Sequence, residues 1–449
     1  MSRSREAWTV LRKRACATAL AGVALATVVL SGCGGGTGLT AAPGVLGAAP
    51  ANSSATATPA AALPVADALR ELRLRATVDA YLAHMTLDEK LGQMVELEVD
   101  IGAGGPVYYP DMDNMVRGLH AGAIIVYIFD TKWPLSQLRD YLNSIQGNAQ
   151  VPLLTMMDEE GGVVDRLEGW DGPRPSAQDL GASGNPQNAY LAAAKDAHDL
   201  RAIGINTDLA PVVDTRLIPN QVEWTRLYGD DPKTVDRYAG AFLQGLQKNG
   251  EIGTLKHWPG IGSIWQDPHL TLPTITRTRA QLEASEFQAF RGVLALDPGL
   301  IMVTHVVVSA IDPNLPATLS PLLVNGVLRK ELGYAGVVVT DNLYMEGIRL
   351  HWALGEAAVL SVMAGDDLLA TAWDSGSMTT ITGALKQAIH DGRISVARID
   401  QSVRRILTLK ARYGLLPPIT TRTPPPVPVA EAIGSGMAVA DRARTVGVV

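Results

Sequence analysis

The sequence contains little cysteine, few aromatic residues and no surplus of positive charge. Only Cys16 and Cys33 occur, both near the amino terminus, so the rest of the chain can form neither a disulfide nor a thiolate metal site. The formal charge of −7 argues against a general nucleic-acid binder, because no basic surplus is left to neutralise phosphates. Aromatic residues make up only 5%, which argues against an aromatic-lined binding module and predicts a core of Val, Leu, Ile and Ala.

Residues 1–32 are typical of a secretory signal. Five basic residues precede an apolar run from about Ala15 to Leu30, which is shorter than the ~20 residues that a membrane span requires. The run ends in Leu-Ser-Gly-Cys, which resembles a bacterial lipobox, whose cysteine becomes the acylated first residue. The sequence thus predicts an exported protein, anchored to the outer face of the cytoplasmic membrane by a lipid on Cys33. A cleaved signal without lipid and a single membrane span are the alternatives.

Composition places the folded region, a single domain, at residues 66–416. Residues 33–65 are rich in Ala, Gly, Thr and Pro and nearly uncharged, which predicts a flexible tether. Residues 417–449 form a tail whose first part is rich in proline, so the preceding helix cannot continue into it. The tail is too short to form a domain. The remaining length suits one barrel with elaborated loops better than a simple open sheet.

Short apolar runs alternate with amphipathic stretches throughout the folded region. This alternation favours a parallel sheet, and eight such units predict an α/β fold of the (β/α)8 TIM-barrel type. A doubly wound sheet is the alternative, although no Gly-x-Gly-x-x-Gly turn follows the first strand. The predicted strands cover residues 91–99, 123–129, 151–157, 207–213, 253–256, 300–303, 336–340 and 367–370, and the clearest helices cover 188–202, 235–248, 279–295 and 355–364.

Polar residues stand at the ends of five successive predicted strands. They are Asp158 after the third strand, Asp214 after the fourth, Lys256 and His257 after the fifth, His305 after the sixth and Asp341 after the seventh. A single Asp after a strand is more often a helix N-cap than a catalyst, but capping does not explain five ends in a row. Because the carboxyl ends of barrel strands share one mouth, the pattern predicts an active site there.

The order and spacing of several segments resemble glycoside hydrolase family 3, in particular its β-N-acetylhexosaminidase branch. The resemblance covers residues 85 to about 415, and its segments are 85–94, 158–162, 209–214, 256–260, 316–320 and 338–341. It implies a retaining exo-β-N-acetylglucosaminidase that acts on peptidoglycan fragments or other glycans with terminal β-linked GlcNAc. The expected partner is therefore a carbohydrate substrate, with no nucleic acid and no second subunit. No cofactor or metal is implied, because a glycosyl–enzyme route needs neither.

The resemblance assigns the chemistry to three residues. Asp341 matches the family nucleophile, which attacks the anomeric carbon; a capping role is the alternative. His269 matches the acid/base of this branch, and Asp267 would fix the tautomer of its ring; an exposed loop histidine is the alternative. Pro268 stands where most relatives have Ser and would stiffen the loop.

Sugar binding follows from the same resemblance. Asp158 matches a carboxylate that accepts hydrogen bonds from sugar hydroxyls, and Lys256 and His257 match a pair that contacts ring hydroxyls. Arg166 and Arg226 match binding arginines of the family, with a surface or salt-bridge role as the alternative.

The chain also departs from the family pattern. Ile261 replaces the His of the usual Gly-His-Gly, Val163 stands where relatives often have Arg, and residues 221–224 replace an Ile-Gly turn. Activity should survive these changes, whereas the leaving-group and N-acetyl preferences are less firmly implied. His305 is expected to support the barrel mouth, and residues 365–367 are expected to be structural.

Four alternatives stay open. Within the family, the enzyme would act on another sugar, or would be a GlcNAc phosphorylase, because a neutral histidine repels phosphate less than a carboxylate does. A metal-dependent barrel hydrolase would use His257, Asp267 and His269 as ligands, and metal analysis would identify it. A lipid-anchored sugar-binding protein on a decayed catalytic fold would release no aryl alcohol from any aryl glycoside.

Overall fold

The computed structural model describes residues 65–107, 111–219 and 224–417. The predicted signal segment, Cys33 and nearly all of the predicted tether and tail lie outside these residues. By its internal contacts the chain divides after Arg70, and the fold belongs to the unit that begins at Glu71. No helix within the described ranges combines the length and apolar character that a membrane crossing requires.

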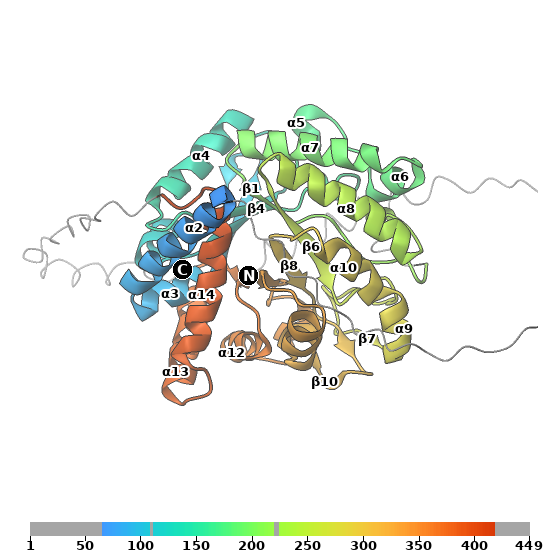
Figure 1. The fold of residues 1–449 in the computed structure, drawn as a ribbon. Helices are drawn as coiled ribbons and strands as arrows, with labels where there is room; N and C mark the ends of the chain where they lie inside the picture. The colour runs from blue at the N-terminus through green and yellow to red at the C-terminus, as the bar shows by residue number, and fades with distance from the viewer. Residues whose placement is uncertain (1–64, 108–110, 220–223, 418–449) are drawn as a thin grey trace, which may run out of the picture. The chain divides into compact units, whose positions relative to one another are not determined.

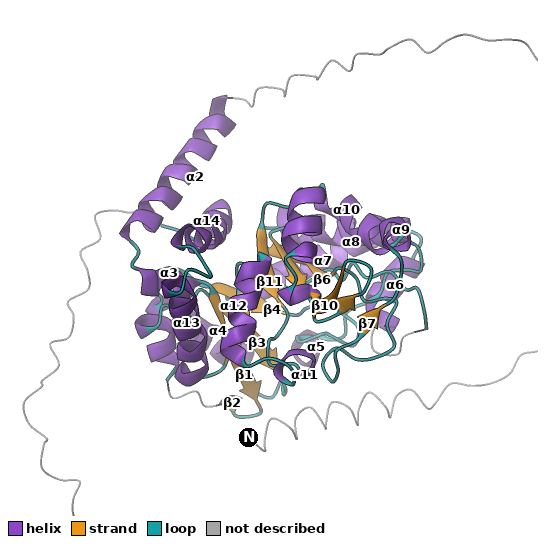
Figure 2. Ribbon diagram, turned by 90° about the horizontal axis from the view of Figure 1, so that it is seen from below, coloured by secondary structure: helices purple, strands orange, loops and turns teal. Residues whose placement is uncertain are grey.

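Eight parallel strands form a closed barrel, which Figure 2 shows inside a ring of helices. Each strand pairs in parallel with the next one along the chain, and the last strand pairs with the first. A parallel bridge between Val339 and Leu368 joins the seventh strand to the eighth and closes the ring. The predicted (β/α)8 barrel is confirmed. Its strands are β1 (Val95–Gly102), β3 (Ala123–Ile128), β4 (Leu154–Met157), β5 (Thr207–Asp208), β6 (Ile252–Trp258), β8 (Leu300–Val303), β11 (Val337–Thr340) and β12 (Leu369–Ala372).

Helices precede, connect and follow these strands (Figure 1). They are α2 (Val65–His84), α3 (Leu87–Gln93), α4 (Leu135–Asn148), α5 (Glu168–Asp171), α6 (Ala177–Ala182), α7 (Pro186–Ala202), α8 (Pro232–Lys248), α9 (Arg279–Ala284), α10 (Glu286–Leu294), α11 (Glu346–Arg349), α12 (Leu354–Ala364), α13 (Ser375–His390) and α14 (Val396–Arg412). Shorter or irregular turns are η1 (Asn114–Gly118), η2 (Trp224–Arg226), η3 (Ala317–Leu319) and η4 (Leu322–Glu331). Strand β2 (Gly105–Pro106) folds back on β1, and β7 (Thr274–Ile275), β9 (Val307–Val308) and β10 (Asp312–Pro316) form a separate small sheet.

Helix α8 illustrates how the local sequence sets the outer layer. Asp231 caps its first turn by accepting hydrogen bonds from the backbone N–H groups of Lys233 and Thr234. Pro232 occupies the first helical position, where its missing N–H costs nothing. Apolar residues recur with the period of one helix face from Val235 to Leu246, and that face is buried.

The structure corrects the bounds of three predicted elements. The strand predicted over 91–99 begins at Val95, because the capping box of Thr86 and Glu89 starts helix α3, which runs to Gln93. The helix predicted over 279–295 is two helices, which meet at Ser285, where φ is −134° and ψ is −86°. The strand predicted over 207–213 is regular only at Thr207–Asp208, since Pro211 has no N–H for a ladder.

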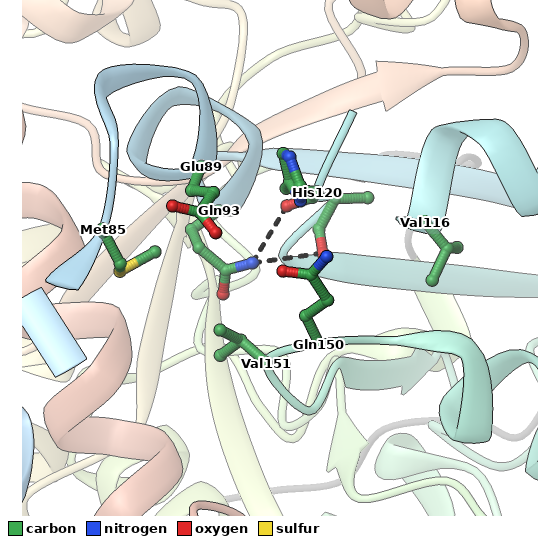
Figure 3. Close-up of a pocket in the computed structure, with 8 residues that line it drawn as sticks. Met85, Glu89, Gln93, Val116, His120, Gln150 and Val151 are labelled. Atoms are coloured by element: carbon green, nitrogen blue, oxygen red, sulfur yellow. Dashed lines mark hydrogen bonds between the residues drawn. The ribbon is translucent and has the colours of Figure 1, made fainter. Parts of the chain in front are cut away.

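A small polar cavity lies at the amino ends of β1, β3 and β4, opposite the carboxyl ends of the strands (Figure 3). Its volume is about 10 Å³, enough for roughly one water molecule. Gln93 Nε2 donates to the carbonyl oxygens of His120 at 2.9 Å and Ala121 at 3.3 Å. Lys410 Nζ donates to Gln93 Oε1 at 2.8 Å. These bonds attach α3 and α14 to the base of the barrel, and the cavity is too small for a sugar.

Asp367, just before β12, holds two helical segments against the barrel. Its fully buried carboxylate accepts hydrogen bonds from Arg329 of η4 at 2.5 Å, and from Arg405 at 2.9 Å and Ser402 at 2.6 Å, both of α14. Burial opposes ionisation, but the nearby guanidinium groups outweigh it and lower the pKa of Asp367. This arrangement matches the structural role expected for residues 365–367.

Replacing Asp367 by Ala should lower the free energy of unfolding by about 3–5 kcal/mol, because it leaves buried cations without their counter-charge. Guanidinium denaturation measures the change. The control is Asp140→Ala on α4, whose partner Arg139 is exposed, and it should change the free energy by no more than about 0.5 kcal/mol. Equal effects of the two substitutions would contradict the proposed role of Asp367.

Candidate active site

The polar side chains at the carboxyl ends of the strands come together at one end of the barrel, as predicted. Lys256 of β6 reaches Asp158 beyond β4, and its Nζ lies 2.6 Å from Asp158 Oδ1. His257 of β6 reaches Asp214 beyond β5, with Nδ1 2.7 Å from Oδ2. Asp341, directly after β11, belongs to the same end of the barrel. The structure therefore brings residues from four strand ends into one site.

Asp341 is a partly buried carboxylate that is held ionised. The hydroxyl of Thr304 donates to its Oδ2 at 2.7 Å, and the backbone N–H of Asn342 donates to its Oδ1 at 2.8 Å. Burial alone would raise its pKa, but three neighbouring histidines and the Thr304 hydroxyl lower the pKa of Asp341 to about 2. The group is therefore a carboxylate at neutral pH, as a nucleophile must be.

Asp267 and His269 form a hydrogen-bonded dyad on the loop after β6. Asp267 Oδ1 accepts hydrogen bonds from the backbone N–H of His269 at 2.9 Å and from its ring Nδ1 at 2.7 Å. Burial would lower the pKa of the imidazole, but the Asp267 hydrogen bond and the charges of Asp341 and Asp267 raise the pKa of His269 above its usual value. With Nδ1 facing Asp267, Nε2 is the ring atom that can transfer a proton.

The loop that carries the dyad is fastened to the loop that carries Asp341. The backbone N–H of Glu346 donates to the carbonyl oxygen of His269 at 3.1 Å. Gly347 beside it has no room for a side chain, since a Cβ atom would lie 2.7 Å from the Thr271 carbonyl oxygen. The candidate acid/base and the candidate nucleophile are thus positioned by direct contact between their loops.

Glu160 is a site residue that the sequence analysis missed. Its carboxylate accepts hydrogen bonds from Arg226 Nε at 2.7 Å and Nη2 at 2.8 Å, and its Oε1 lies 2.6 Å from Lys256 Nζ. Burial raises its pKa, but Arg226 and Lys256 outweigh burial and hold the pKa of Glu160 well below its usual value. The pKa of Lys256 is raised, because Asp158 and Glu160 outweigh its own burial. The sequence signal that could have identified Glu160 is its position two residues after Asp158 in the same motif.

His257 is oriented by Asp214. In addition to its contact with the ring Nδ1 of His257, Asp214 accepts a hydrogen bond from the backbone N–H of Ile261 at 2.9 Å. The side chain of Ile261 is buried in the core. The replacement of the family's His by Ile261 therefore exchanges a polar side chain for apolar packing, and the backbone hydrogen bond to Asp214 does not depend on that side chain. The next residue, Gly262, must be a glycine, because a Cβ atom there would lie 1.7 Å from the carbonyl oxygen of Thr215.

The two predicted binding arginines differ in their surroundings. Arg226 joins the network through Glu160, and its Nη2 lies 3.4 Å from His257 Nε2. The guanidinium of Arg166 makes no hydrogen bond to another described residue, and its Nε is buried. A buried donor without a protein partner is one that a bound ligand can satisfy. The structure therefore connects Arg226 to the site directly, and it does not connect Arg166.

His257 and His269 pair with different carboxylates, so the ligand set considered for a metal hydrolase does not assemble. Across the described ranges, no three His, Cys, Asp or Glu side chains are grouped to hold a metal ion. His305 Nδ1 is hydrogen-bonded to the Thr318 hydroxyl at 2.8 Å. Its Nε2 lies 2.9 Å from the Asn342 carbonyl oxygen, which can only accept a hydrogen bond. Both contacts agree with a supporting role for His305.

Comparisons with known proteins agree on one family. The model described as glycosyl hydrolase family 3 N terminal domain matches residues 86–409. Beta-hexosaminidase LpqI of Mycobacterium tuberculosis is 31% identical over 383 residues, which cover 81% of this chain and 92% of that protein. The solved structure of M. tuberculosis LpqI superposes with a TM-score of 0.67 at 30% identity, over 74% of this chain and 96% of that one. A family 3 beta-N-acetylglucosaminidase from Paenibacillus sp. gives a TM-score of 0.69 at 37% identity, over 74% of this chain but only 63% of that one.

Asp267→Asn should move the high-pH limb of kcat/KM to lower pH. Removing the Asp267 charge lowers the pKa of His269, so the proton needed by a poor leaving group is lost at a lower pH. Asp341 contributes no limb near neutrality, because its pKa is about 2. Rate measurements against pH on wild type and variant give both limbs, and an unmoved high-pH limb would refute the role of Asp267.

Proposed function

Because the chain belongs to glycosyl hydrolase family 3 and is a glycoside hydrolase, we propose that it is a retaining exo-β-N-acetylglucosaminidase. Its substrates are peptidoglycan fragments or other glycans that end in β-linked GlcNAc. The observation that carries the proposal is the ionised Asp341 beside the Asp267–His269 dyad, with the two loops joined by a backbone hydrogen bond.

The first step forms a glycosyl–enzyme intermediate. A carboxylate oxygen of Asp341 attacks the anomeric carbon while the bond from that carbon to the leaving oxygen breaks. His269 transfers its Nε2 proton to the leaving oxygen. The Asp267 carboxylate holds the ring by Nδ1 and stabilises the imidazolium before the transfer.

The second step releases the sugar. His269, now neutral at Nε2, takes a proton from water as the water oxygen attacks the anomeric carbon. The bond between that carbon and Asp341 breaks, and the carboxylate is restored. Two inversions at the same carbon retain the β configuration. One histidine serves both steps, because it gives a proton in the first and recovers one in the second.

Sugar hydroxyls bind to the charged network around Lys256. Asp158 accepts hydrogen bonds from hydroxyls, while Lys256, Arg226 and His257 donate to or contact ring oxygens. Arg166 adds a donor when substrate binds. These roles are proposals from the family motif, supported by the contacts that hold four of the five side chains at one end of the barrel.

The preference for the N-acetyl group rests on the named relatives. LpqI is called a beta-hexosaminidase, and the Paenibacillus relative a beta-N-acetylglucosaminidase. A relative from Cellulomonas fimi, 30% identical over 76% of this chain and 60% of that protein, is called a beta-N-acetylglucosaminidase/beta-glucosidase. That double name makes a glucosidase activity the second candidate function.

The enzyme acts outside the cytoplasmic membrane, where a lipid on Cys33 retains it, and works as a monomer. Support for the anchor comes from the basic region, the apolar run and the lipobox-like Leu-Ser-Gly-Cys, all of which precede the described residues. An exported location would place the enzyme beside the peptidoglycan that supplies its substrates.

Asp341→Ala should reduce kcat on an aryl β-GlcNAc by about 10⁴-fold or more, because no other carboxylate replaces the covalent nucleophile. His269→Ala should cost about 10²–10⁴-fold on a disaccharide but far less on an aryl substrate, whose leaving group departs with little protonation. The exposed Leu191→Ala on α7 is the control and should match wild type. Full activity of Asp341→Ala would exclude the mechanism.

A panel of aryl β-glycosides tests the sugar assignment. Wild type should hydrolyse the β-GlcNAc substrate with a kcat/KM at least about tenfold above that for the β-glucoside, the discrimination expected from a few lost contacts. The rate should not change when inorganic phosphate is added. A higher rate on the glucoside would favour the second candidate function, and a glycosyl phosphate product would identify a phosphorylase.

A further inference from the structure

Glu159, between Asp158 and Glu160 on the segment after β4, is completely buried and makes contacts that the proposed mechanism does not use. Its Oε2 accepts hydrogen bonds from the backbone N–H groups of Arg166 at 2.8 Å and Leu167 at 3.2 Å. One carboxyl oxygen therefore joins the start of this segment to positions 7 and 8 residues later. The segment is closed into a loop, which holds the backbone of Arg166 within one side-chain length of Glu159.

The start of this loop is fixed to the barrel. The backbone N–H of Glu159 donates to Asp208 Oδ1 on β5 at 3.0 Å. The neighbouring carboxylates of Asp158 and Glu160 each lie 2.6 Å from Lys256 Nζ. Because none of these contacts uses the side chain of Glu159, we expect Asp158 to keep its place when that side chain is changed.

The far end of the loop is braced from outside by Arg174, whose side chain is buried. The backbone N–H of Arg174 donates to Asp165 Oδ2 at 2.7 Å, and its Nη1 donates to Asp165 Oδ1 at 3.2 Å. Arg174 Nε donates to Asp196 at 2.8 Å and Nη2 donates to Asp199 at 2.9 Å, both on α7. The residue just before Arg166 is therefore tied to the outer layer of helices.

The acceptor oxygen of Glu159 matters more than its charge. Burial first, and then the charges of Asp165 and Asp196, raise the pKa of Glu159 to about 9. Arg174, whose Nε lies 3.9 Å from Oε1, and the hydrogen bond from Arg166 oppose this rise without cancelling it. The carboxyl group is therefore neutral at pH 7. A glutamine amide, which has the same shape and a carbonyl oxygen, is its closest replacement.

Arg166 is the residue that this loop presents. Its guanidinium makes no hydrogen bond to another residue in the described ranges, and its Nε is buried. A long side chain without partners loses much conformational freedom when it binds a ligand, and that loss weakens binding. Fixing the backbone from which the side chain extends reduces the loss, and it keeps the guanidinium within reach of a sugar bound to Asp158.

We propose that Glu159 is a positioning residue for substrate binding, which it serves by holding the Arg166 backbone close to the sugar-binding Asp158. The proposal rests on the proposed function, because it takes Arg166 as a sugar ligand. Glu159 is completely buried, so it does not itself contact the sugar. Its loss should therefore weaken substrate binding, while the chemical steps at Asp341 and His269 proceed at nearly the same rate.

Glu159→Ala and Glu159→Gln test the proposal on whichever aryl β-glycoside the wild type hydrolyses. Glu159→Ala leaves two backbone N–H groups without their acceptor and should raise KM about tenfold, with kcat within about threefold of wild type. Glu159→Gln keeps the acceptor oxygen, so its KM should stay within about threefold of wild type. An unchanged KM for Glu159→Ala, or a kcat that falls while KM is constant, would overturn the proposal.

Asp312→Ala is the matched control. Asp312, on β10 of the separate small sheet, is also buried, and its Oδ1 accepts from the backbone N–H groups of Asn314 at 3.1 Å and Leu315 at 3.2 Å. Melting curves should show a loss of stability in both alanine variants, whereas only Glu159→Ala should raise KM. A rise in KM in both would indicate a general loss of structure and overturn the proposal. If Glu159→Ala does not fold, Glu159→Gln decides, since a tenfold rise in its KM contradicts an acceptor role.

A double-mutant cycle with Arg166→Ala shows whether Glu159 acts through Arg166. The variant that carries both Glu159→Ala and Arg166→Ala should have a KM no higher than that of Arg166→Ala alone, because no guanidinium is left to misplace. Additive increases in KM would show that the two residues act independently, and they would overturn the proposal.

Failure of the proposed function would be recognised separately. If Arg166→Ala leaves KM unchanged, Arg166 is not a sugar ligand, and that part of the proposed function fails together with the positioning role. If Arg166→Ala raises KM and Glu159→Ala does not, only the positioning role fails.

A crystal structure of Glu159→Ala gives a readout without turnover. The backbone of Arg166 and Leu167 should shift relative to β5, while Asp158 Oδ1 should stay 2.6 Å from Lys256 Nζ. An unshifted backbone at these two residues would overturn the proposal.

Discussion

A lysine ammonium buried between two carboxylates is the interaction on which the geometry of the site depends. Lys256 Nζ lies 2.6 Å from both Asp158 and Glu160, and Glu160 in turn binds Arg226. Away from water, an unpaired charge costs several kcal/mol, so each of these groups is confined to the place where its partner lies. The segments that follow β4 and β5 are thereby fixed to β6 before substrate binds, and the donors that meet the sugar need little reorganisation.

The catalytic groups are electrostatically coupled across the same end of the barrel. His269 is among the histidines that lower the pKa of Asp341, and the Asp341 carboxylate is one of the charges that raise the pKa of His269. Each group thus favours in the other the state that the first step requires, an ionised nucleophile and a protonated acid. Environments that push two pKa values in opposite directions are the usual way in which one site supplies both roles.

The barrel and its mouth could be predicted from the sequence, because hydrophobic period and strand-end polarity are local signals. The last three residues of α3 are predicted as strand because the buried Leu91 and Gln93 run directly into β1, and the local signal for a helix is the Thr86–Glu89 capping box at its start. Glu160 was missed for another reason. Its partner Arg226 is far away in the sequence, and an acid that follows a strand gives no sign of which distant group will face it. The roles carried over for Asp341, His269 and the sugar-binding residues remain predictions, although their geometry permits them.

Charge within the barrel is balanced in two different ways. Around Lys256 the carboxylates are matched by cations, whereas on β1 burial and neighbouring acids raise the pKa values of Glu96 and Glu98. Burial and neighbouring acids therefore favour the neutral forms of these two carboxyl groups. Neutral carboxyl groups can donate and accept hydrogen bonds without competing for the histidines that hold Asp341 ionised. The low pKa of Asp341 depends instead on the neighbouring histidines and on the Thr304 hydroxyl, which outweigh its burial.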